Sequence, residues 1–210
     1  MMRRAIISIM TAVLAGVVPA TGSAQTAGVA ATATETAAAG QFISNLADKV
    51  FAVLKENQSK GATKAKFRGL LKDNFAVDTA GAKLIRRYRN QITPAQLAAY
   101  QSALPDYVVN VYADRLIAYG DASVKVVRTQ AHGSSGNVDV FSHIIVPGKK
   151  ELDIIWLVEK GAGGKWLIDN VTVSGVNMSL TQEADFSAFI AKNGFDALVA
   201  MMKSSNARTA

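Results

Sequence analysis

Two histidines and two aspartates in the second half of the chain have the side-chain types for acid–base or metal chemistry. His132 and His143 do not form the His-x-x-x-His or His-Glu-x-x-His spacing that binds zinc. The 210 residues include no cysteine, which excludes a thiolate zinc site, a disulfide framework and a cysteine nucleophile. Asp139 and Asp153 are spaced to approach each other across a hairpin, but single acids on strand faces are usually solvated. We therefore predict no metal site and no catalytic residue.

A glycine-rich segment ending in lysine, Gly161 to Lys165, has the composition of a phosphate-binding loop. Trp166 stands where such a loop carries the hydroxyl residue that holds magnesium, and the segment joins two predicted strands instead of opening a helix. No Gly-x-Ser-x-Gly elbow is present to expose a serine nucleophile. The sequence predicts a hairpin turn here, no cofactor and no enzyme activity.

A basic cluster and a basic overall charge bear on partners. The formal net charge is +7, and Lys83, Arg86, Arg87 and Arg89 lie close together. Such a cluster is either a solvated face or a surface that docks to an acidic partner or to lipid headgroups. The residues alone leave both interpretations open.

The first 24 residues have the three parts of a secretory signal peptide. Two arginines precede an apolar run from Ala5 to Val18, and small residues follow up to Ala24, where we predict cleavage. The run has about 14 apolar residues, and a membrane span needs roughly 20. We predict that the mature protein is exported to the periplasm, where nucleic acid is not a partner.

The predicted elements divide the mature chain into helices followed by strands. Residues 25–40 are almost wholly Ala and Thr and predict a disordered leader, residues 41–204 a folded domain, and residues 205–210 a polar tail. Apolar residues at three- and four-residue steps predict helices from Phe42 to Lys55, around Phe67 and near Leu84. Thr93 forms a capping box with Gln96, and the long helix that follows should kink or divide at its internal proline, residue 105.

The strands begin at Ser123, where the apolar period changes from about 3.6 to 2. Glycine-rich turns separate four strands at about 123–131, 137–146, 151–160 and 165–176, and short turns imply an antiparallel meander. Helical stretches then include Phe186 and the segment from Phe195 to Met202. This order predicts the α+β class. Both strand faces carry apolar residues, so the sheet must be covered twice or curl around something apolar.

Short motifs follow one another from the helices to the end of the chain: Tyr88-Arg89, Thr93-Pro94-Ala95-Gln96, Tyr112-Ala113, Trp166-Leu167-Ile168-Asp169-Asn170-Val171, Gly175-Val176-Asn177-Met178 and Gly194-Phe195-Asp196-Ala197-Leu198. In this order and spacing they resemble the MlaC (toluene-tolerance auxiliary) family, from about Phe42 to Ser204. The chain departs from the family pattern at Asn170, Asn177 and Pro105. These departures concern the lipid and the docking partner more than the fold.

The resemblance implies a periplasmic carrier that passes phospholipid between an outer-membrane lipoprotein complex and an inner-membrane ABC transporter with an MCE-type subunit. The implied fold is a curved, NTF2-like four-stranded meander with helices at both ends that enclose an apolar cavity for the acyl tails. Each exposed methylene costs about 0.8 kcal/mol, so two sixteen-carbon tails would cost on the order of 25 kcal/mol in water. A sheet that is apolar on both faces can meet helices with one face and line a pocket with the other.

Strand alternation predicts which residues line that cavity, together with two from the long helix. Any of them can equally be ordinary core. The predicted lipid-binding residues are Val124, Val126, Val140, Ile144, Ile154, Trp156, Val158, Tyr107 and Val111.

Three alternatives remain. A sister branch of the family is associated with hopanoids. A small isomerase or hydratase on a similar fold would need Asp139 or Asp153 beside a tyrosine, whereas alternation places both acids opposite Trp156 and every tyrosine lies in the helical half. A periplasmic adaptor that binds only protein would have a filled core.

Overall fold

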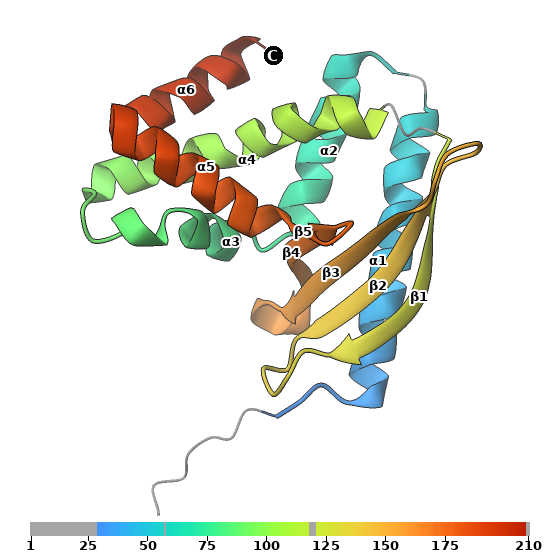
Figure 1. The fold of residues 1–210 in the computed structure, drawn as a ribbon. Coiled ribbons are helices and arrows are strands. Elements are labelled where there is room, and N and C mark those ends of the chain that lie inside the picture. Colours follow the sequence, from blue (N-terminus) through green and yellow to red (C-terminus); the bar gives the residue numbers. More distant parts are fainter. Residues whose placement is uncertain (1–28, 57, 118–120, 209–210) are drawn as a thin grey trace, which may run out of the picture.

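A helical half and a sheet half lie side by side in this protein (Figure 1). The structure is a computed structural model that describes residues 29–56, 58–117 and 121–208. In chain order, helices precede the five strands of the sheet and two further helices follow it. The predicted α+β class is confirmed.

The first helix, α1 (Ala33–Lys55), runs along one face of the sheet (Figure 1). The Thr32 hydroxyl accepts a hydrogen bond from the Glu35 amide, and the Glu35 carboxylate accepts one from the Thr32 amide. Hydrogen bonds from Lys160 and from Thr32 lower the pKa of Glu35 to about 2.

The start of α1 corrects the predicted disordered leader at 25–40. The helix begins at Ala33, because alanine has the highest helix propensity and the capping box of Thr32 satisfies the first amides. The prediction of disorder is wrong here because small residues can still pack closely, as Ala39 does in full burial. The predicted signal peptide at residues 1–24 lies outside the described residues.

Three short elements connect α1 to the long helix: α2 (Lys60–Asn74), α3 (Val77–Leu84) and the 3-10 turn η1 (Arg86–Tyr88). The end of α2 is tied to the sheet, because Phe75 forms an isolated bridge with Ile168. This bridge brings the helices that follow to the edge of the sheet at its fourth strand.

The long helix α4 (Pro94–Ile117) begins at the predicted capping box. The Thr93 amide donates to Gln96 Oε1 at 2.9 Å, and the Gln96 amide donates to Thr93 Oγ1 at 3.2 Å. Pro105 lies inside the helix, which continues beyond it, so the expected division at this residue does not occur.

The sheet is an antiparallel meander in the order β1 (Ser123–Ala131), β2 (Val138–Ile145), β3 (Leu152–Lys160), β4 (Trp166–Val173) and β5 (Val176–Asn177). The first four correspond to the four predicted strands. The two-residue β5 is additional. Bulges interrupt the register once between β1 and β2 and once between β3 and β4, which increases the local twist of the sheet.

Two turns explain where the strands end. The segment from Gly161 to Lys165 is the predicted hairpin turn, closed by a 2.8 Å hydrogen bond from the Gly161 amide to the Lys165 carbonyl. Ser174 and Gly175 both have positive φ, at 46° and 83°, and reverse the chain inside what the sequence predicted as one strand. The reversal ends β4 and creates β5.

The last two helices are α5 (Met178–Asn193) and α6 (Phe195–Arg208). Gly194 has φ of 86° and separates them, because glycine adopts this left-handed backbone without steric cost. The segment predicted as a polar tail at 205–210 is helical up to Arg208, where α6 ends.

Each half has its own main cluster of buried residues, and a third, smaller cluster lies between α2 and α4. The helical core joins α3, α4, α5 and α6, and the sheet core joins α1 to the sheet. Phe67, Val109 and Ala113 form the small middle cluster between α2 and α4. The residues of the sheet core are Ala39, Ile43, Leu46, Val138, Val140, Val158 and Ile168.

Candidate functional site

The inner face of the sheet, defined as the face toward α1, carries all seven predicted strand residues. The register pairs Val124 with Ile144 and Val140 with Trp156. Ser142 pairs with Val126 on one side and with Ile154 on the other. Directly paired residues of an antiparallel sheet lie on the same face. The seven predicted strand residues therefore share one largely apolar face, which also contains the hydroxyl of Ser142.

This inner face packs against α1. Val140 and Val158 are fully buried in the sheet core, and Val126 and Trp156 pack against that core. The Trp156 indole donates a 2.9 Å hydrogen bond to Ser142 Oγ, so its polar atom is satisfied within the face. Because these strand residues contact α1, they are part of a packed core. The side of α1 that faces them is apolar.

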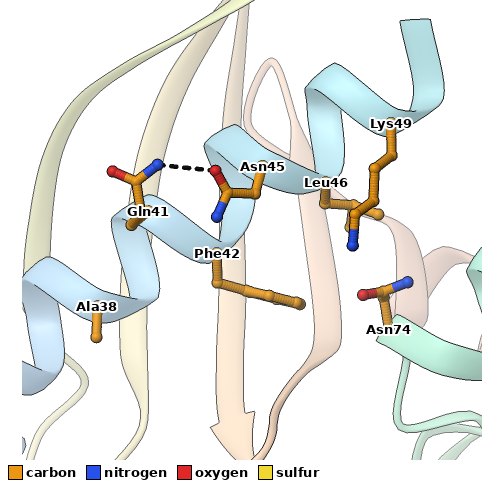
Figure 2. A pocket seen from close by; sticks show the side chains of 7 residues that line it. All are labelled: Ala38, Gln41, Phe42, Asn45, Leu46, Lys49 and Asn74. Atoms are coloured by element: carbon orange, nitrogen blue, oxygen red, sulfur yellow. Dashed lines mark hydrogen bonds between the residues drawn. The ribbon is translucent and has the colours of Figure 1, made fainter. Parts of the chain in front are cut away.

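A hollow opens between α1 and the end of α2, and we call it the α1–α2 hollow (Figure 2). Its volume is about 330 Å³. Phe42 and Leu46 line it and also contact the sheet core, while Gln41 and Asn45 bond to each other at its rim. Lys49 and the amide of Asn74 face each other on the far side (Figure 2). The hollow has an apolar floor, continuous with the sheet core, and a polar rim.

A second hollow, of about 370 Å³, lies among α4, α5 and α6, and we call it the α4–α5 hollow. Two predicted site residues, Tyr107 and Val111, line it, whereas the seven predicted strand residues line neither hollow. Its lining residues are Tyr107, Val111, Tyr112, Met178, Thr181, Gln182, Asp185, Phe186, Phe189 and Met201.

Most of the α4–α5 hollow was missed from the sequence. Met178, Gln182 and Met201 lie in helices that the sequence predicts only in outline, and their approach to α4 is set by long-range packing. The helical spacing of Phe186 and Phe189 indicated a buried stripe on α5. It carried no signal that α4 is the partner of that stripe.

Two tyrosine hydroxyls of the helical half, those of Tyr100 and Tyr107, have raised pKa values. Burial raises the pKa of Tyr107, and the neighbouring Tyr112 and Asp185 raise it further. Burial also raises the pKa of Tyr100, whose hydroxyl donates a 2.9 Å hydrogen bond to the Gly81 carbonyl. Near neutral pH these phenols act as hydrogen-bond donors and not as bases.

The basic cluster is partly used in ion pairs to buried acids. Lys83 Nζ lies 2.5 and 2.6 Å from the carboxylate oxygens of Asp169, and Arg86 donates to Glu183 at 2.8 Å. Burial raises the pKa of Glu159, and Asp169 raises it further, while Lys83 opposes the rise. These contacts tie α3 to β4 and η1 to α5, so much of the cluster is structural.

The two histidines and two aspartates with potential for acid–base chemistry form two separate pairs. Asp139 lies 2.9 Å from His132, and Asp153 lies 2.9 Å from His143. The register places both acids on the face of the sheet that does not carry Trp156, as predicted, and it pairs Asp139 with Leu157. Within residues 29–56, 58–117 and 121–208, no group of three or more His, Asp and Glu side chains could hold a metal ion.

None of the helices that the structure describes has the length and apolar character needed to cross a membrane.

Comparison with known proteins gives two findings that agree. The family model described as MlaC protein matches residues 44–204. Among solved structures, a phospholipid-binding protein from Ralstonia solanacearum, determined in complex with a phospholipid, has a similar fold with a TM-score of 0.69. The match covers 81% of this chain and 98% of the Ralstonia chain, at 22% sequence identity.

Proposed function

The chain belongs to the MlaC family, and we propose that it is a non-catalytic carrier that buries the acyl tails of a phospholipid. The observation that carries the proposal is the fold match, which extends over 98% of a protein whose structure contains a phospholipid. The apolar inner face of the sheet supports the same function, because tails need apolar walls and volume more than specific polar groups.

We place the tails between α1 and the inner face of the sheet. Each hollow, at about 330 and 370 Å³, lies at the lower end of the range of about 300–1,000 Å³ that holds one drug-sized ligand. Two long tails need more room, so packed elements must separate. The α1–α2 hollow is the natural starting point, because Leu46 belongs both to its floor and to the sheet core, and Phe42 packs against that core.

Separation of α1 from the sheet has a small net cost when lipid enters. The surfaces that part are apolar and include side chains such as Ile43 and Val140, and the tails cover both surfaces again with apolar atoms. The hydrophobic cost of exposing the tails in water is removed at the same time. The headgroup would stay at the polar rim, near Lys49 and Asn74.

Cellular location and transport partners form the second part of the proposal. The secretory pattern of residues 1–24 supports export to the periplasm. There the protein would receive and deliver lipid at an outer-membrane lipoprotein complex and at an MCE-type subunit of an inner-membrane ABC transporter, as its family membership suggests.

Native mass spectrometry of the protein purified from the periplasm, followed by solvent extraction and lipid analysis, tests the proposal. We expect close to one diacyl phospholipid per chain. A bound hopanoid would replace the phospholipid assignment by the hopanoid alternative. A protein that is empty on purification, and stays empty after incubation with phospholipid vesicles, would contradict the carrier function.

A further inference from the structure

The α4–α5 hollow combines an apolar wall with a single kind of charge. Met178, Phe189 and Met201 supply apolar surface, and Tyr107 supplies an aromatic ring beside it. Among the lining residues that the structure describes, Asp185 is the one with a charged side chain. The hollow therefore combines one negative charge with apolar surface.

Aromatic rings stand next to the carboxylate. The rings of Tyr107 and Phe186 have centroids 6.0 Å apart, tilted by 49°. Asp185 lines the same hollow as Tyr107, and its negative charge contributes to the raised pKa of that phenol. Phe186, which follows Asp185 in the chain, is buried in the helical core. A carboxylate and aromatic faces at one hollow form the two groups that stabilise an organic cation.

We propose that the α4–α5 hollow binds an ammonium group that carries an apolar chain, with the nitrogen between Asp185 and Tyr107 and the chain against the methionines. A quaternary or primary ammonium over an aromatic face is attracted by the negative face of the ring, and the carboxylate adds Coulomb attraction. An anion of the same shape is repelled by Asp185. The volume of about 370 Å³ fits a small amphiphile and is too small for a diacyl lipid.

This proposal is separate from the proposed function, because the α4–α5 hollow shares no lining residue with the α1–α2 hollow. The ammonium can come from a free amine or from the headgroup of a choline lipid, and both sources have the same recognition chemistry. The experiment uses one probe for each source.

Methionine methyl NMR locates the binding. A chain that starts at Gln25 contains three methionines, and Met178 and Met201 line the hollow whereas Met202 is fully buried in the helical core. Hexyltrimethylammonium should shift the methyl signals of Met178 and Met201 more than that of Met202. Hexanesulfonate, with the same chain and the opposite charge, should bind at least tenfold more weakly. Equal affinity for the two probes would overturn the proposal.

Variants separate recognition from folding. Asp185→Asn should weaken hexyltrimethylammonium by about tenfold and leave hexanesulfonate no weaker. Asp48→Asn removes the same charge from an exposed position of α1 and should change neither affinity. Tyr107→Phe keeps the ring and should retain most of the binding, whereas Tyr107→Leu should lose it. Unchanged binding in Asp185→Asn would also overturn the proposal.

Hexylphosphocholine, a lipid analogue that carries the choline headgroup on a single six-carbon chain, distinguishes the two sources. Shifts of Met178 and Met201 by this lipid, reduced in Asp185→Asn, would support the site with a lipid headgroup as ligand. Shifts by hexyltrimethylammonium alone would support the site with a free amine as ligand. If neither probe moves the two signals, the hollow does not bind an ammonium group.

Discussion

The helical half and the sheet half of this protein differ in the side chains that form their cores and in the helices that enclose them. In the helical core, four helices surround aromatic side chains, with Tyr100 in edge-to-face contact with Phe186 and close to Phe195. In the sheet core, α1 lies along the inner face, and the buried side chains are aliphatic, with Phe42 and Trp156 partly buried against them. Aromatic packing with a bonded hydroxyl fixes one arrangement, whereas aliphatic contacts along one helix can be exchanged for acyl chains. The comparison suggests a rigid scaffold beside an element that can separate.

The largest expected effect tests the rigid half. Leu198 is fully buried in the helical core, so Leu198→Ala should lower the free energy of unfolding by about 3 kcal/mol through reduced burial and the cavity left behind. Chemical denaturation measures this decrease. Lipid bound per folded chain should stay unchanged. A variant that is folded but no longer holds its lipid would show that the helical core takes part in binding.

The second prediction compares one substitution at a buried position and at an exposed position of the sheet. Val140→Thr places a hydroxyl on the buried inner face and should lower stability by about 1–2 kcal/mol and lipid per chain by at least half. Val127→Thr makes the same change at an exposed position and should stay within about 0.5 kcal/mol with lipid unchanged. Denaturation and lipid phosphorus per chain measure both. Equal lipid loss in the two variants would refute the inner-face site.

Two matched substitutions of helix caps test the same comparison with smaller expected changes in stability. Thr93→Ala removes the cap of α4 in the helical half and should cost about 1 kcal/mol in global unfolding. Thr32→Ala removes the cap of α1, whose first turn is largely exposed, and should mainly increase amide exchange of that turn. A full decrease of about 1 kcal/mol in global stability for Thr32→Ala would mean that α1 is docked as firmly as α4.

The smallest effect is a pH dependence at the start of α1. Because the pKa of Glu35 is lowered from 4.5 to about 2, its contribution is present above about pH 4.5 and is lost as the pH falls toward 2. Amide exchange of the first turn of α1 should therefore increase across this interval. Glu35→Gln should remove the dependence, and a variant that keeps it would assign the effect to another acid.

Local chemistry made the strands and most helix positions predictable. Glycine turns and period-2 alternation placed β1 to β4, and the capping box of Thr93 placed the start of α4. The start of α1 could also have been predicted, because Thr32 and Glu35 have the spacing of a capping box. It was missed because the segment has almost no large apolar residues. The strand β5 depends on two consecutive residues with positive φ, and Ser174 is not a residue type that demands it.

The candidate site was less predictable, because its walls meet through long-range packing. Alternation placed Val140 and Trp156 on one face, but it could not indicate that α1 covers this face. The hollow beside Tyr107 is completed by Met201, and all the strands of the sheet separate these two residues in the sequence. Sequence periodicity assigns a residue to a face, and the partner of that face is decided by the tertiary fold.

Hydrogen–deuterium exchange of delipidated and phospholipid-loaded protein tests the central claim most directly. If α1 separates from the sheet to admit the tails, loading should change the protection of α1 and of β2 and β3 and leave α6 unchanged. The same exchange in α1 with and without lipid, or changes confined to α4, α5 and α6, would contradict binding at the inner face of the sheet.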